Sequence, residues 1–276
     1  MSGGGSISMS IDWEKLTQAI YVRQSRRKFL DRPLDRKDRE ALEMFAADIE
    51  REVPFQHEAH TLIRAVPEGL RPVSFVGASS FAAFTAPQTP LGEAHVGFLG
   101  EILVLKATDL GLGTCWVAQF RRLDTYQAVF GSTEEGAPRT IHAVTPLGYV
   151  TEKVSGISDR ITTSIFSGRK KSVEKNLSQD SLVEFPENVR WVLELASKAP
   201  SALNAQPWTF RVTDTWDRFV IEIAKPEGYQ HKAWGHSDID VGICAAHVWL
   251  GLMSRKVEHE LEVIDSPGRV VWTFKL

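Results

Sequence analysis

The chain has 276 residues, of which 43% are hydrophobic and 24% are charged, and this balance is typical of a globular protein with a large core. Its formal net charge of −3 argues against nucleic acid or an anionic membrane surface as the main partner. The length allows one large domain or two domains of moderate size.

The N-terminal residues and the cysteines bear on location and on metal binding. Residues 1–10 are rich in Gly and Ser and lack the basic and apolar parts of a secretory signal, so we expect a flexible tail. No apolar run in the sequence approaches the roughly 18 residues that cross a bilayer. Cys115 and Cys244 form no Cys-x-x-Cys pair, and no His pair has ligand spacing. We therefore predict a cytoplasmic protein without a structural metal.

The first half of the chain alternates helical and extended patterns. Trp13, Leu16 and Ile20 recur at helical spacing. The segment 93–110 is apolar nearly all round, which predicts a helix buried on most faces, with Gly111 as its C-terminal cap. The expected elements are helices at 12–24, 35–52 and 93–110, strands at 61–66, 73–77 and 141–145, an apolar run at 81–85 and an extended segment at 114–118.

The second half begins with a polar connection at 151–183. Pro186 then opens a helix, at the position that proline tolerates best. Asp240 is expected to cap a second apolar helix at 241–254. The expected strands lie at 208–212, 218–223, 261–265 and 269–276.

Two features recur at an offset of roughly 145 residues. The basic run at 26–28 and the helix after it resemble the run at 169–171 and its own following helix. The buried helix after His95-Val-Gly97 resembles the helix after Asp240-Val-Gly242. A repeat of this length predicts two duplicated half-domains rather than a solenoid.

Two distant segments carry the chemistry that a flavin mononucleotide needs. Arg23-Gln-Ser25-Arg-Arg27-Lys-Phe29 places guanidinium groups and a hydroxyl within one or two turns, which suits a dianionic phosphate. The segment 199–208, Ala-Pro-Ser-Ala-Leu-Asn-Ala-Gln-Pro-Trp, is a corner that leads into a strand, where backbone and amide groups can meet a flat heterocycle. Together the two segments indicate a site for FMN.

With Gly111-Leu-Gly-Thr-Cys-Trp116 and Leu147-Gly-Tyr149, these segments make a set of four motifs that resembles the nitroreductase family. The resemblance covers roughly residues 12–260. It implies an α+β, nitroreductase-like three-layer fold with antiparallel-dominated sheets and buried central helices.

The order of the motifs departs from the family's usual form. That form is an intertwined homodimer, in which one subunit supplies the arginines and the other supplies the Pro-Ser-Asn corner. Here the slot at 48–56 lacks the corner, and Gly-Leu-Gly is missing near 256–260. The resemblance therefore points to a single-chain subfamily whose two degenerate halves, 11–170 and 171–276, imitate the dimer. It implies one FMN per chain and a monomeric protein.

The resemblance also assigns cofactor-binding residues. The expected phosphate and ribitol ligands are Arg23, Ser25 and Arg27, joined by Arg169 and Lys171. The expected contacts to the flavin ring are the backbone of Trp116, Val117 and Ala118 near N5 and O4, and the residues Pro200, Ser201 and Asn204. No side chain is expected to act as a nucleophile. Arg26 and Lys28 stand where many relatives have apolar or neutral residues, which leaves open which basic groups reach the phosphate.

The activity implied by the resemblance is that of an FMN-dependent oxidoreductase. NAD(P)H would donate a hydride and leave, and a nitroaromatic, a quinone or another flat acceptor would take its place, giving ping-pong kinetics. Donors at the pyrimidine edge would stabilise the charge of the reduced flavin. The alternative is a degenerate protein that binds flavin or another small ligand without turnover. A third possibility keeps the flavin and changes the reaction, and the loop at 81–94 is a candidate lid for that case.

Structural interpretations of the same residues stay open beside the functional ones. The run Arg23–Lys28 can be a basic helix end, and the corner at 199–208 can be helix-stop chemistry. Cys115 is better explained as a buried small residue than as a nucleophile, and Asp240 as a cap rather than an acid. Gly-Leu-Gly follows a helix, which argues against a Rossmann site, and no Gly-x-Ser-x-Gly elbow supports a hydrolase.

Overall fold

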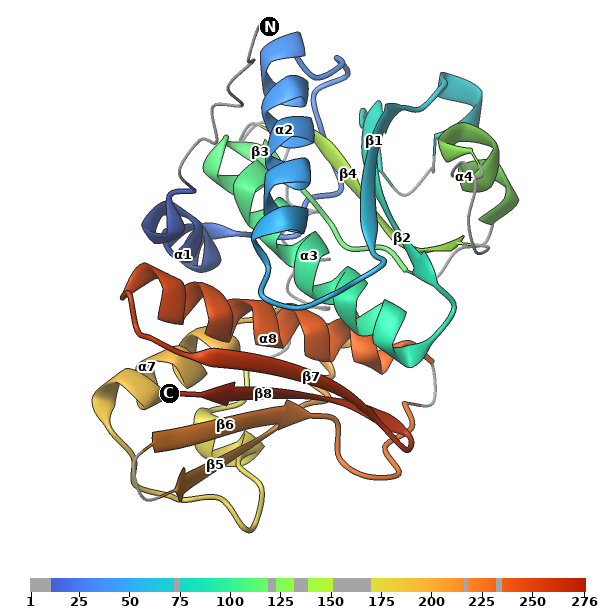
Figure 1. Cartoon of the computed structure of the whole chain (residues 1–276). Helices are drawn as coiled ribbons and strands as arrows, with labels where there is room; N and C mark the ends of the chain where they lie inside the picture. The colour runs from blue at the N-terminus through green and yellow to red at the C-terminus, as the bar shows by residue number, and fades with distance from the viewer. Residues whose placement is uncertain are drawn as a thin grey trace, which may run out of the picture.

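The computed structural model describes residues 11–71, 75–118, 123–131, 139–150, 170–215, 218–231 and 235–276. Two four-stranded sheets lie on either side of two long helices, α3 (Pro90–Asp109) and α8 (Ser237–Ser254), as Figure 1 shows. One sheet comes from the first part of the chain and the other from the second part. The expected α+β fold with three layers, sheet, central helices and sheet, is therefore confirmed.

In the first part of the chain, amphipathic helices precede the sheet. The helix α1 begins after Asp12, whose side chain accepts a hydrogen bond from the Lys15 N–H, and it buries Leu16 and Ile20. The elements in this part are α1 (Trp13–Val22), α2 (Arg36–Glu52), β1 (His60–Ala65), the 3-10 helix η1 (Glu68–Leu70), β2 (Ser80–Pro87), α3, β3 (Leu112–Gly113), α4 (Leu123–Phe130) and β4 (Arg139–Tyr149).

The second part of the chain has a similar course. Its helices again come before a hairpin, in which Thr209 pairs with Ala224 and Thr215 pairs with Arg218. The elements in this part are α6 (Val173–Asn176), α7 (Glu187–Ala196), the 3-10 helix η2 (Ala202–Asn204), β5 (Thr209–Thr215), β6 (Arg218–Ala224), α8, β7 (Glu260–Ser266) and β8 (Arg269–Lys275).

The two sheets share one strand order. The first runs β1-β2-β4-β3 and the second runs β5-β6-β8-β7, and the paired strands are antiparallel in both. In each sheet the long central helix connects the second strand to the third along the chain. This common course is consistent with the internal duplication that the sequence repeat indicates.

The central helices pack closely because glycines lie between them. A Cβ atom at Gly97 of α3 would overlap the carbonyl oxygen of Ile239, and one at Gly242 of α8 would overlap the carbonyl oxygen of Ala94. Most residues of α3 and nearly every residue of α8 are buried, as the all-round apolar pattern of 93–110 predicted for the first of them. The backbones can come this near only where side chains are absent.

Three expectations differ from the structure. The candidate lid at 81–94 is instead the buried strand β2, which pairs with β1 and β4, followed by Thr89 as the N-cap of α3. The helix α8 begins at Ser237 rather than at 241, so Asp240 lies inside its first turn. In place of a strand at 73–77, Val76 forms an isolated parallel bridge with Lys28, and residues 72–74 lie outside the described part of the chain.

None of the helices in the described residues is long and apolar enough to cross a membrane. No group of His, Cys, Asp and Glu among the same residues could hold a metal ion. Cys115 and Cys244 are both buried.

Candidate cofactor site

Arg23 is the residue that caps the C-terminal end of α1, and its guanidinium group lies beside Glu101 of the central helix α3. Its backbone N–H donates to the Ala19 carbonyl and closes the helix, while its side chain is only 11% exposed. The guanidinium Nε lies 3.8 Å from Oε1 of Glu101 on α3. The buried Nη1 makes no hydrogen bond with any described residue. A buried guanidinium nitrogen without an acceptor is costly, so this position suits a ligand that brings an oxygen.

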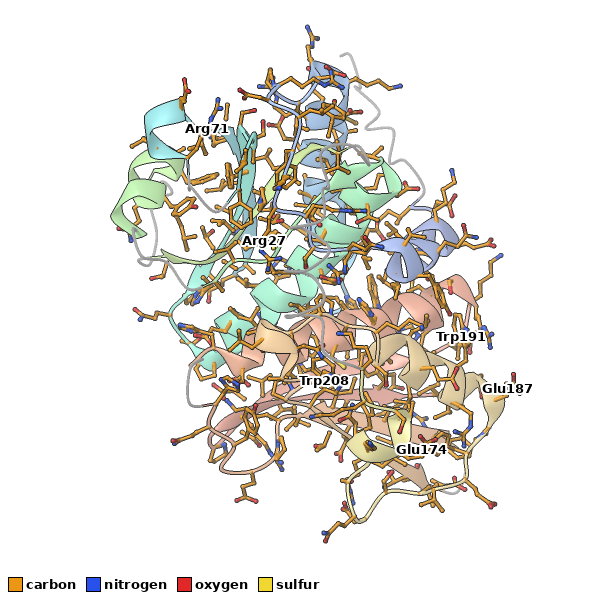
Figure 2. All side chains as sticks on the ribbon, turned by 180° about the vertical axis from the view of Figure 1, so that it is seen from behind. Arg27, Arg71, Glu174, Glu187, Trp191 and Trp208 are labelled. Atoms are coloured by element: carbon orange, nitrogen blue, oxygen red, sulfur yellow. The ribbon has the colours of Figure 1, made fainter. Side chains whose placement is uncertain are left out.

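The rest of the arginine segment is held by its backbone. Ser25 forms a parallel bridge with Thr114, and the Arg26 N–H donates to the Thr114 carbonyl at 2.7 Å. On the other side, the Arg27 carbonyl accepts from the Val76 N–H at 3.0 Å. The backbone of this segment is therefore hydrogen-bonded to Thr114 on one side and to Val76 on the other. Figure 2 shows Arg27 in the part of the molecule that holds the first sheet.

The expected backbone contacts at 116–118 are fixed by pairing with the first sheet. Val117 and Val144 exchange two backbone hydrogen bonds, of 2.9 and 2.7 Å. The Trp116 ring packs on Phe84 with centroids 5.1 Å apart, and its indole Nε1 donates to Oε2 of Glu101 at 2.7 Å. The carboxylate near Arg23 thus also holds the side chain at the start of this segment.

The Pro-Ser-Asn corner has an unusual backbone. Leu203, Asn204 and Gln206 all have positive φ values, of 50°, 54° and 50°. Such angles cost free energy in residues other than glycine and persist only where the surroundings enforce them. Ser201 Oγ accepts from the Gln206 N–H at 2.9 Å, and Asp240 Oδ1 accepts from the Ala202 N–H at 3.0 Å. The corner is thus clamped onto the first turn of α8.

This bond gives Asp240 a role different from the expected one. We predicted that Asp240 caps the helix that follows it, yet the residue that precedes α8 is His236, and its side chain makes no capping bond. The Asp240 carboxylate instead serves the backbone at the start of η2, which it reaches from 38 residues away in sequence. Trp208, which follows the corner, is fully buried below the central helices (Figure 2).

Two neighbouring lysines act differently on the corner. Lys171 Nζ donates to the carbonyls of Ala205 and Gln206 at 3.1 and 3.0 Å, so it holds the corner from outside. Lys170 Nζ donates to the Ala199 carbonyl at 2.6 Å. The Lys170 residue as a whole is exposed, whereas its ammonium group lies among protein atoms. Desolvation, followed by the nearby charge of Arg23, lowers the pKa of Lys170 to about 8.

The two cations lie far apart in the sequence. Arg23 follows α1 and Lys170 comes shortly before α6, and the charge of Arg23 helps to lower the pKa of Lys170. The carboxylates of Glu101 and Asp240 also act on Lys170, so the region is a cluster of charged groups between the two parts. Two cationic side chains, one of them with a guanidinium nitrogen that lacks an acceptor, suit a ligand that carries an anionic group or a carbonyl oxygen. The donor set therefore fits FMN.

The comparisons with known proteins agree with the fold. A family model described as "Putative TM nitroreductase" matches residues 15–252, which is most of the chain. The chain belongs to the nitroreductase family. Comparison with curated proteins finds none that matches.

Solved structures of nitroreductases resemble the chain to different extents. A "putative nitroreductase" from Thermotoga maritima is 20% identical with a TM-score of 0.61, and the match covers 99% of this chain and 98% of that one. A nitroreductase family protein from Clostridium difficile is 18% identical with a TM-score of 0.41, covering 63% of this chain and 100% of the other. A nitroreductase with bound FMN from Bacteroides fragilis is 16% identical with a TM-score of 0.40, covering 50% and 89%. The first match supports the nitroreductase fold over almost the whole chain.

Within this nitroreductase fold, Lys170 Nζ contacts the Ala199 carbonyl at the start of the 199–208 corner, and the charge of Arg23 acts on the same lysine. It directs Lys171 to the corner itself, and Arg169 lies outside the described residues. The sequence interpretation missed Lys170, Glu101 and also His247 of α8, whose Nε2 lies 3.1 Å from Oε1 of Glu101. The basic run at 169–171 contained the signal for Lys170, whereas Glu101 and His247 stood out only as single polar residues in apolar helices.

Proposed function

We propose that this member of the nitroreductase family is an FMN-dependent oxidoreductase, which takes a hydride from NAD(P)H and passes it to a flat acceptor such as a nitroaromatic or a quinone. The observation that carries the proposal is the buried Nη1 of Arg23, which has no hydrogen-bond partner among the described residues although Nε of the same side chain is held 3.8 Å from Glu101. An anionic or carbonyl edge of the cofactor would give this donor the acceptor that it lacks.

The proposed roles of the residues follow from their places in the fold. Arg23, Ser25 and Arg27 would hold the phosphate and ribitol, with Lys170 as an additional cation. The strained corner would present Pro200, Ser201 and Asn204 to the ring, because its clamps fix the backbone before any ligand binds.

Bound FMN would supply hydride transfer between the nicotinamide and the acceptor. The chain's own groups bind and orient, and none of the proposed site residues is a nucleophile. Cations and backbone donors near the ring edge would favour the reduced, more negative form of the cofactor by electrostatic attraction. The Trp116–Ala118 backbone, which is fixed by its pairing with β4, would keep its place through both half-reactions.

The arrangement also supports one site per chain. The arginine segment belongs to the first part of the chain and the corner to the second, and the slot at 48–56 lacks the corner motif. We therefore propose that the halves 11–170 and 171–276 form a pseudo-dimer and that the protein works as a monomer with one FMN.

The test mixes FMN-loaded protein with NADH or NADPH in the absence of oxygen and follows the flavin absorbance. Reduction of the flavin lowers this absorbance, and its reoxidation by an added quinone restores it. We expect both half-reactions. The variant Arg23→Ala should weaken FMN binding by at least about tenfold, which corresponds to about 1.4 kcal/mol. Arg36→Ala is the matched control, because Arg36 is exposed on α2 and pairs with its helix neighbour Glu40, away from the candidate site. FMN that binds and resists reduction by both nicotinamides would support the degenerate alternative and overturn the enzymatic proposal.

A further inference from the structure

Glu101 lies in the middle of α3, and its side chain is completely buried. Its Oε2 accepts the hydrogen bond of the Trp116 indole at 2.7 Å, and its Oε1 lies 3.1 Å from Nε2 of His247 on α8. The same Oε1 lies 3.8 Å from Nε of Arg23. One carboxylate thus joins a histidine of the second part of the chain to two residues expected at the cofactor.

The contact between Glu101 and His247 must hold a proton. Nδ1 of His247 lies 2.9 Å from the Leu195 carbonyl, which can only accept, so Nδ1 carries a hydrogen. The contact on the other side of the ring, at 3.1 Å, also needs a hydrogen, on either His247 or Glu101. In both cases the pair as a whole is neutral. A neutral, hydrogen-bonded pair avoids the cost of an isolated buried charge.

This polar pair occurs on one side of the two central helices. The offset that relates Gly97 to Gly242 also relates Glu101 to Ala246, and it relates Ile102 to His247. The counterparts Ala246 and Ile102 are apolar and fully buried. The side with the polar pair is the side of Arg23, Lys170 and the corner. A buried polar pair seldom adds stability over well-packed apolar residues, so stability alone does not explain it.

We propose that Glu101 is a positioning residue of the cofactor site and that His247 fixes its orientation from α8. The inference deepens the proposed function and rests on it. Glu101 restrains Arg23 through Nε, which leaves Nη1 for the ligand, and it restrains Trp116 at the start of the segment expected beside the ring. Through His247, the position of both residues depends on α8, which also holds the corner by Asp240.

The decisive variant is Glu101→Gln. The amide oxygen can still accept from Trp116 and the amide nitrogen can donate to His247, so the packing is kept while the oxygen that faces Arg23 is replaced by a donor. We expect the FMN dissociation constant to rise by about tenfold or more, with a thermal midpoint within about 3 °C of the unaltered protein. Glu50→Gln is the matched control, because Glu50 also pairs with a histidine, His60, at 2.9 Å but lies outside the candidate site.

A second variant removes the polar pair altogether. The double change Glu101→Leu with His247→Leu makes this side apolar like its counterpart. Because Arg23 and the Trp116 indole then lose their acceptor, we expect a lower thermal midpoint together with loss of FMN binding. A spectroscopic readout accompanies both variants. The Trp116 indole N–H resonance should move in cofactor-free Glu101→Gln protein, and in the unaltered protein when FMN is added.

The outcomes separate the two proposals. If the unaltered protein binds FMN and both variants bind it equally well, the positioning role is wrong and the proposed function stands. If FMN leaves the Trp116 resonance of the unaltered protein unchanged, the positioning role is also wrong. If the unaltered protein does not bind FMN, the proposed function fails and this inference fails with it.

Discussion

Lys256 follows α8 in the same left-handed backbone conformation that Gly111 adopts after α3, with φ values of 53° and 76°. Each residue stands directly after the residue that caps its helix. Glycine adopts left-handed backbone angles without strain, whereas in lysine the Cβ atom clashes with the backbone at these angles. The second part of the chain therefore keeps the turn of the first part without the residue that suits it best.

This relationship predicts that Lys256→Gly stabilises the protein. Relief of the left-handed strain gains about 1–2 kcal/mol, and the greater freedom of glycine in the unfolded chain removes part of that gain. We expect a net gain of up to about 1 kcal/mol in the free energy of unfolding, measured in urea. The reverse change, Gly111→Ala, should lose about 1 kcal/mol, since no atom lies near enough to clash and only the backbone angle opposes it. A loss of stability in Lys256→Gly would contradict this account of the turn.

The glycines between the central helices predict much larger losses. Gly97→Ala and Gly242→Ala would each push a methyl group into a backbone carbonyl of the opposite helix. Because backbone cannot move aside as a side chain can, each change should cost at least about 2 kcal/mol. Gly69→Ala is the control, since a Cβ atom at Gly69 meets nothing within 4 Å. Thermal unfolding of the three variants checks the prediction, and similar midpoints for all three would show that the helices are not in close contact.

His236 and Glu93 predict a pH dependence of stability. Nδ1 of His236 lies 2.6 Å from Oε1 of Glu93, and this hydrogen bond raises the pKa of His236 above its ordinary 6.5. Because the folded pKa is the higher one, the stabilisation is complete below the unfolded pKa and is lost as the pH rises through the folded pKa. We expect His236→Gln to reduce the loss of unfolding free energy between about pH 6 and about pH 8. An equal loss in the variant and the unaltered protein would exclude a contribution from this pair.

Lys170 predicts how FMN binding responds to pH. Its pKa is lowered to about 8, first by desolvation and then by the charge of Arg23. An anionic ligand favours the charged lysine, so affinity should be steady below about pH 8 and should fall above it, by up to about tenfold for each further pH unit. The variant Lys170→Met should bind FMN more weakly and lose this dependence. Isothermal titration at several pH values measures both, and an unchanged profile in Lys170→Met would remove Lys170 from the site.

Local patterns predicted most of the fold. The spacing of Trp13, Leu16 and Ile20 predicted α1, and the apolar run at 93–110 predicted α3, because helix periodicity is visible within one segment. The start of α8 was missed, since Ser237 and Asp238 look like loop residues. In the structure Asp238 is buried beside Lys225, with Oδ2 and Nζ 2.5 Å apart. That partner comes from tertiary structure, which no local pattern reveals.

The candidate site was only partly predictable. The family motifs led to Arg23 and to the corner at 199–208, and the roles of those residues in binding FMN stay predictions. Glu101 and His247 could not be found, because they lie 146 residues apart and acquire their partners only when α3 packs on α8. The same limit applies to Lys170: the sequence shows a basic run, but the folded backbone decides which ammonium group approaches Arg23.

The central claim is that both parts of one chain build a single FMN site. We would saturate the protein with FMN, remove the free cofactor, and measure bound flavin per chain together with the mass in solution. The account predicts one non-covalent FMN per monomer. Two flavins per chain, one flavin per chain found only in an obligate dimer, or no bound flavin would contradict it.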